Sequence, residues 1–200
     1  NTYGEDLFIS SPIVSIRNDL SVRDNSILNQ NGNTINLGGD LTIDGLYKTG
    51  TVGPRRFSFF GNSSATPATK QNQIVKIKLG TNDPFYDFVV NKPNGGIVEL
   101  SNDPIYSNSN VILKNTLEFS INNTGLLTTG ASRYVQVGTS VADLASVQRF
   151  GGGYVNGELR RWFNDGAQDK TFMVGTASDY TPARIEVTNG TGTAGTISVT

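Results

Sequence analysis

The 200-residue chain contains no cysteine and no histidine. The absence of histidine removes the commonest general base and the commonest metal ligand in proteins. The absence of cysteine excludes a disulfide framework, although a long stack of β-strands needs no such bridges and a secreted protein can do without them. Catalysis by a histidine or cysteine constellation is therefore excluded, whereas acid–base chemistry by carboxylates remains.

A strong charge of either sign is also missing, since 16 basic and 17 acidic residues give a formal net charge of −1. The pairs Arg55-Arg56 and Arg160-Arg161 are too short for basic patches, and we interpret them as solvated surface. No apolar run approaches the ~20 residues of a membrane-spanning helix. We therefore predict no nucleic-acid partner and no membrane span.

A signal peptide is not apparent at the start of the chain, which begins at Asn1, and the chain stops at Thr200 within a strand-like pattern. We interpret the sequence as a mature or cut piece of a longer protein.

Helical periodicity is scarce, and the best helical candidate is the short segment Val141–Phe150. Apolar residues instead alternate with polar ones in runs of about four to six residues, each bounded by Asn, Gly, Asp or Pro. This pattern predicts an all-β protein. Examples of the alternating pairs are Val14/Ile16, Leu20/Val22, Ile35/Leu37, Leu41/Ile43, Phe57/Phe59, Val75/Ile77 and Val135/Val137.

The strands are separated by very few residues, as in the sequence from Ile16 to Leu20, which suits a corner better than a hairpin. Corners of this kind, where the chain bends without reversing, predict a right-handed β-helix-like stack of short strands. A Greek-key sandwich is the alternative, because its strands also alternate.

An internal repeat supports the stack. The segment VSIRNDLSV from Val14 aligns with VILKNTLEF from Val111, and TINLG ending at Gly38 aligns with YVQVG ending at Gly138. Repetition of this kind indicates stacked architecture. We expect the two copies to occupy equivalent coils and to bury Val14, Ile16, Leu20, Val111, Leu113 and Leu117.

The last third has a different pattern, which begins after the helical candidate with Gly151-Gly152-Gly153. We therefore predict a β-repeat region with an internal duplication over residues 1–140. A β-sandwich-like segment, interpreted as incomplete, is predicted over residues 141–200.

Acidic residues do not form a catalytic pair that the sequence can identify. Asp40 and Asp44 would share one face of a strand about 13 Å apart, beyond the roughly 5–9.5 Å of glycosidase carboxylates. The Asn-Asp-Pro triplets at 82–84 and 102–104 are interpreted as turns, with calcium binding kept as the alternative. We predict no catalytic residues, no metal site and no cofactor.

Aromatic residues offer the only candidate ligand contacts. Phe57 and Phe59 alternate and are expected in the core, which turns Phe60 outward. The candidate ligand-contact aromatics are Phe60, Tyr86 and Trp162.

Several stretches in order carry a family resemblance: NGNTINLGGDLTIDG at 31–45, RFSFFGNSSATPATKQNQI at 56–74, the segment 85–138, GYVNGELRRWF at 153–163 and FMVGTASDYTPARIEV at 172–187. Together they resemble the large secreted cell-surface proteins of Bacteroidetes, the adhesin-like cargo of type IX secretion. The resemblance implies a secreted, surface-exposed, non-enzymatic β-repeat stalk or fibre with a role in adhesion, gliding or surface coating.

The expected partners are neighbouring repeats of the same chain and surface polysaccharide or other cell-surface proteins. Two alternatives stay open. A carbohydrate-binding or polysaccharide-degrading β-helix would need clustered carboxylates and a basic residue in one groove, and a phage tail-fibre segment would need a trimeric seam.

Overall fold

The computed structural model describes residues 5–61, 69–80, 82–121, 124–143, 145–188 and 194–200. Within these ranges the regular structure is β-strand, apart from one 3₁₀ turn, η1 (Pro104–Tyr106). None of the described segments forms a helix long and apolar enough to span a membrane. The predicted all-β class is confirmed.

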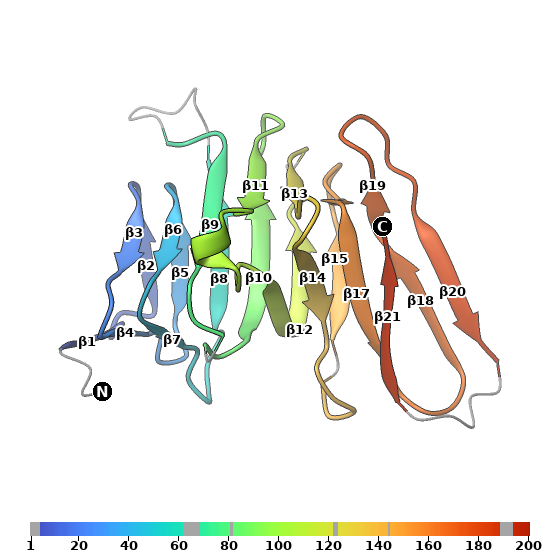
Figure 1. The fold of residues 1–200 in the computed structure, drawn as a ribbon, viewed down its shortest axis with the longest axis horizontal. Helices are drawn as coiled ribbons and strands as arrows, with labels where there is room; N and C mark the ends of the chain where they lie inside the picture. Colours follow the sequence, from blue (N-terminus) through green and yellow to red (C-terminus); the bar gives the residue numbers. More distant parts are fainter. Residues whose placement is uncertain (1–4, 62–68, 81, 122–123, 144, 189–193) are drawn as a thin grey trace.

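Two long sheets run along the molecule, a three-stranded sheet lies at its N-terminal end, and the two-stranded pair of β18 (Gln168–Phe172) and β20 (Ala183–Val187) lies at the other end (Figure 1). Sheet one contains β1 (Glu5–Phe8), β4 (Ser26–Asn29) and β7 (Leu46–Lys48). Sheet two contains β2 (Ile13–Ile16), β5 (Thr34–Leu37), β8 (Arg56–Phe60), β10 (Phe85–Asn91), β12 (Val111–Phe119), β14 (Tyr134–Val137), β15 (Ser146–Arg149), β17 (Glu158–Phe163) and β21 (Gly195–Val199). Sheet three contains β3 (Leu20–Val22), β6 (Leu41–Ile43), β9 (Gln73–Ile77), β11 (Ile97–Leu100), β13 (Leu126–Thr128), β16 (Val155–Asn156) and β19 (Val174–Gly175).

Up to β7 the chain visits the three sheets in turn, and from β8 to β14 it alternates between sheets two and three. Successive strands of each sheet pair in parallel through these coils. From β4 it passes to β5, to β6 and back to β7, which pairs with β4. Figure 1 shows the result, a stack that runs from the N-terminus at one end to the C-terminal strands at the other. This is the predicted β-helix-like stack, which is confirmed.

The parallel pairing continues past residue 140, because β16 pairs with β13 and β19 with β16. Antiparallel pairing joins β17 to β21, and joins β18 (Gln168–Phe172) to β20 (Ala183–Val187). The β-helix is thus followed by a small antiparallel segment. A division into two units at residue 140 stays a prediction.

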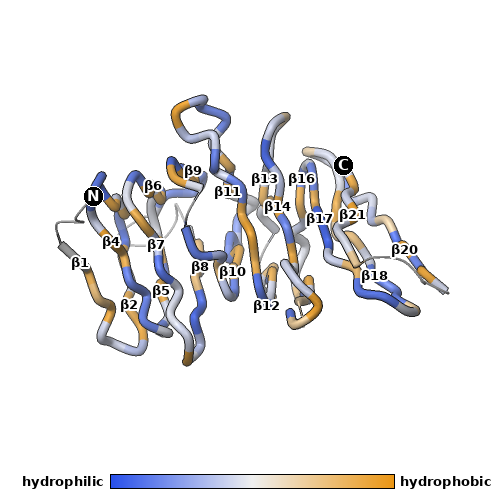
Figure 2. The backbone as a smooth tube through the Cα atoms, turned by 60° about the horizontal axis from the view of Figure 1, so that its bottom comes forward, coloured by the Kyte–Doolittle hydropathy of each residue, from blue (hydrophilic) through white to orange (hydrophobic). Residues whose placement is uncertain are grey.

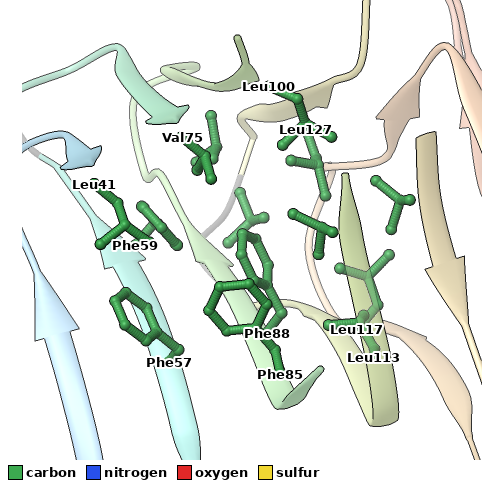
Figure 3. Packing of buried hydrophobic residues seen from close by; sticks show 14 of the residues in the cluster. Leu41, Phe57, Phe59, Val75, Phe85, Phe88, Leu100, Leu113, Leu117 and Leu127 are labelled. Atoms are coloured by element: carbon green, nitrogen blue, oxygen red, sulfur yellow. The ribbon is translucent and has the colours of Figure 1, made fainter. Parts of the chain in front are cut away.

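The core is a column of inward side chains on successive strands. Phe88 of β10 lies in register with Phe57 of β8 and Leu117 of β12, and all three are fully buried. The Phe59 ring lies 5.3 Å from that of Phe57 and 4.9 Å from that of Phe88, centre to centre. Figure 3 shows these rings together, and Figure 2 shows polar and apolar residues alternating along the coils. The core role predicted for Phe57 and Phe59 is confirmed.

The prediction of a helix at Val141–Phe150 is wrong. Residues 146–149 form β15, in which Val147 lies opposite Leu117 of β12 and packs half-buried against the core. Before the strand, the Asp143 carboxylate accepts hydrogen bonds from the backbone and hydroxyl of Thr139. A ladder with a partner about 30 residues away overrides the weak local helical pattern.

The repeat is half confirmed. Val14 pairs with Ile35 as Val111 pairs with Val135, so the first halves of the two copies occupy equivalent positions in sheet two. The second halves differ. In the first copy the chain turns a corner after β2 and enters sheet three as β3, where Leu20 N donates to Asp40 O at 2.8 Å. In the second copy there is no corner, and Leu117 lies in the same strand as Val111.

Burial follows the same division. Val111, Leu113 and Leu117 are buried as predicted. The expectation for Val14, Ile16 and Leu20 is wrong, because they are only partly buried against the core. They lie on β2 and β3, each of which has a described neighbouring strand on one side only.

Asn31 and Gly32 form a turn between β4 and β5, with φ of 50° and 76°. A Cβ at Gly32 would lie 1.8 Å from the carbonyl oxygen of Val52, whereas one at Gly95 (φ 75°) would meet nothing closer than 3.9 Å. Gly95→Ala should cost about 1 kcal/mol of unfolding free energy for the left-handed conformation. Gly32→Ala should cost about 2–3 kcal/mol, because the Val52 backbone must also move. Urea unfolding of both variants checks the order, and equal losses would contradict it.

Candidate functional site

The three candidate aromatics lie on different parts of the long sheet. Phe60 ends β8 opposite Asn91, whereas Tyr86 lies near the beginning of β10. Trp162 lies in β17, and its Nε1 donates to Asn164 Oδ1 at 2.9 Å. All three are half-buried, and the structure does not bring them together.

Tyr86 lines a surface cleft of about 180 Å³. The cleft, which we call the Arg55 cleft, is formed by the end of sheet one, the chain leading into β8, and strands β10 and β12. The residues used below that line it are Thr51, Arg55, Asp83, Tyr86 and Lys114.

The Arg55 guanidinium lies 3.4 Å above the centre of the Tyr86 ring, a stacked cation–π contact. Its backbone is held from both sides, because Arg55 N donates to Gly32 O at 3.1 Å and Arg55 O accepts from Asp87 N at 3.2 Å. Its φ of 42° is in the left-handed region, where a residue with a Cβ is strained. The Nε atom is buried and has no hydrogen-bond acceptor among the described residues.

The charge around the Arg55 cleft is positive. Asp83 is the acidic residue that lines the cleft. Its carboxylate accepts a hydrogen bond from Thr49 N at 3.1 Å and lies 3.7 Å from Lys48 Nζ. Arg55 and Lys114 form no ion pair within the described part of the chain. Three cations and one carboxylate therefore leave a formal charge of +2 at this position.

Side chains of both Asn-Asp-Pro triplets bond to backbone groups. Asn82 Oδ1 accepts from Tyr47 N at 2.6 Å, which closes the end of sheet one, and Asp103 Oδ1 accepts from Ile105 N at 3.0 Å, which caps η1. Their oxygens are thus used by the backbone. Among the described residues no group of three or more acidic side chains is placed to hold a metal ion. Calcium binding at the triplets stays a prediction.

A second polar cluster lies on sheet two. Arg56 Nη2 of β8 donates to Glu118 Oε1 of β12 at 2.7 Å, and so reaches across the intervening strand β10. Asp87 of β10 accepts from Asn115 Nδ2 at 2.6 Å. Burial raises the pKa of the Asp87 carboxyl, and the Asn115 hydrogen bond and the Arg56 charge partly offset that rise. Two carboxylates and an arginine are therefore close together here, although each makes contacts that a structural ion-pair network also makes.

Comparisons with protein-family models, with curated proteins and with solved structures find no match.

Asp40 and Asp44, which we expected to lie too far apart for a catalytic pair, flank β6. The Asp40 carboxylate pairs with Lys70 and accepts from Ile74 N at 2.8 Å. This acid helps to join neighbouring coils, and nothing in its contacts indicates catalysis.

Lys92 is a buried charge that the sequence did not reveal. Its side chain is fully buried, and Nζ donates to Gln73 Oε1 and to Lys70 O at 3.2 Å. Burial lowers the pKa of the Lys92 ammonium to about 7, with Asp40 opposing the decrease. The sequence gives little sign that this lysine is buried, because Lys92 directly follows a strand, a position where many lysines are exposed.

The interpretation of the arginine pairs as solvated surface is wrong. Arg161 is inward on β17, buried, and donates from Nη1 to Thr171 O at 2.9 Å. Arg160 is half-buried, stacks 3.6 Å above the centre of the Tyr134 ring and pairs with Glu158 at 2.6 Å. Arg55 and Arg56 are also half-buried in the contacts given above. These contacts come from neighbouring coils, so the local sequence does not show them.

Proposed function

We propose that this chain is a structural or adhesive module of a large secreted bacterial surface protein, part of a stalk or fibre. The observation that carries the proposal is the stack itself, in which coils follow one axis with inward residues in register over the length of the molecule. Each coil satisfies its backbone hydrogen bonds through its neighbours, so the stack can be lengthened without a larger core.

The outer surface suits an extracellular role. Side chains such as Asn36, Ser15 and Thr42 alternate with the core residues and face away from them. Such a surface keeps an elongated and nearly neutral molecule soluble. Coils of this kind can hold a binding surface at a distance from the cell.

Surface exposure can be tested by labelling, because the natural chain has no cysteine and therefore no thiol background. Ser21→Cys places a thiol at an exposed position of β3, and Val98→Cys places one at a fully buried position of β11. In intact cells that produce the protein, a membrane-impermeant maleimide should label Ser21→Cys and spare Val98→Cys. Both variants should react after denaturation.

Labelling of Ser21→Cys only after cell lysis would place the chain inside the cell and refute the proposal. The same reagent on the unmodified protein serves as the blank.

A polysaccharide-degrading β-helix is the second candidate, because Arg56, Asp87 and Glu118 meet on one sheet. Each of these side chains has a structural partner, and for that reason we place this candidate second. Turnover of a polysaccharide that is lost in Asp87→Asn, with the fold retained, would put it first.

A further inference from the structure

We infer that the Arg55 cleft binds a carboxylate-bearing sugar ring of an acidic polysaccharide. This inference rests on the proposed function, because it names the class of ligand that the surface module would bind.

The first argument is charge. Arg55 and Lys114 line the cleft without an acidic partner in the described chain, and the one acid there, Asp83, is already shared with Lys48. An anion entering the cleft would meet a local formal charge of +2.

The second argument is preorganisation. The Tyr86 ring stacks on the Arg55 guanidinium, and backbone bonds to Gly32 and Asp87 hold the residue in a left-handed conformation. A planar guanidinium held in this way presents a fork that matches a planar carboxylate with two parallel hydrogen bonds. Backbone strain of this sort persists where the surrounding structure maintains it, often at binding sites.

The third argument identifies a sugar. The cleft volume of about 180 Å³ is small, and apart from Tyr86 and Pro84 its lining offers hydroxyl, carboxylate and backbone groups, including Thr51 and Asp83. A ring with several hydroxyl groups needs donors and acceptors placed around it in this way. The exposed lining is polar and apolar in about equal parts, which suits the mixed surface of a sugar ring.

The test is titration calorimetry of the full chain at physiological salt with unesterified oligogalacturonates, their methyl-esterified forms and dextran sulfate. We expect binding of the unesterified oligomer only. Arg55→Lys, which keeps the charge and loses the planar fork, should weaken binding roughly tenfold. Lys114→Gln should weaken it severalfold.

Arg23→Lys is the matched control, because Arg23 is exposed and lies outside the cleft. Circular dichroism of each variant checks that the fold is retained. Equal binding of the methyl ester, equal binding of dextran sulfate, unchanged binding by Arg55→Lys, or no binding of any of the three ligands would each overturn the inference.

The two proposals can fail separately. Surface labelling without oligogalacturonate binding would remove the ligand assignment and leave the surface module. Binding without surface labelling would keep the site and remove the proposed location.

Discussion

Phe88→Ala should lower the free energy of unfolding by about 3–5 kcal/mol, the cost of a large cavity in a packed core. The Phe88 side chain is fully buried at the centre of the stack. Its ring centre lies 4.9 Å from that of Phe59 and 5.4 Å from that of Phe85, in edge or tilted contacts that add to the burial. Because Phe57 and Leu117 lie in register on either side of Phe88, the cavity would remove packing contacts between three successive coils.

Equilibrium urea unfolding measures this effect. Phe150→Ala is the matched control, since the Phe150 side chain is 60% exposed and its removal should change stability by no more than about 0.5 kcal/mol. Equal midpoints for the two variants would show that the rings do not form a cooperative core. A lower slope in Phe88→Ala alone would show that the stack unfolds in parts, as repeat proteins can.

The stability of the natural chain should rise with pH above neutrality because of Lys92. Its pKa in the folded protein is about 7, below the ordinary value of 10.5. Above pH 10.5 the side chain is neutral in both states and imposes no penalty. As the pH falls toward 7 the unfolded chain takes up a proton that the folded chain does not, so stability falls by about 1.4 kcal/mol per pH unit.

Urea unfolding at several values between about pH 7.5 and 10 tests this slope. Lys92→Met should flatten it, because the titrating group is gone. Lys114→Met removes an exposed lysine and should keep it. A slope that persists in Lys92→Met would mean that other groups cause the pH dependence.

Local patterns predicted the β-strands and their inward faces. Alternation over a few residues is enough to show that Phe57 and Phe59 share a side, because successive side chains of a strand point to opposite faces. The corner between Ile16 and Leu20 could also be predicted, since a short polar link between apolar pairs bends the chain without reversing it.

Pairing between distant strands was beyond the same patterns. Residues 146–149 have no clear β signal, and become a strand because β12 offers its free edge there. The copy of the repeat at Val111 extends as one strand where the copy at Val14 turns, although the apolar positions match. Local spacing cannot distinguish these outcomes, because the hydrogen-bond partners that decide them lie on other coils.

The candidate site shows the same limit. Tyr86 could be selected as an aromatic contact, but Arg55 was interpreted as solvated, and nothing near it in sequence shows that it stacks on Tyr86. The sequence by itself determined an all-β stack and its buried face, because these depend on periodicity within single strands. Only the tertiary structure decided that Arg55, Asp83 and Tyr86 meet in one cleft, since that depends on how many residues each coil contains and therefore on which side chains become neighbours across coils.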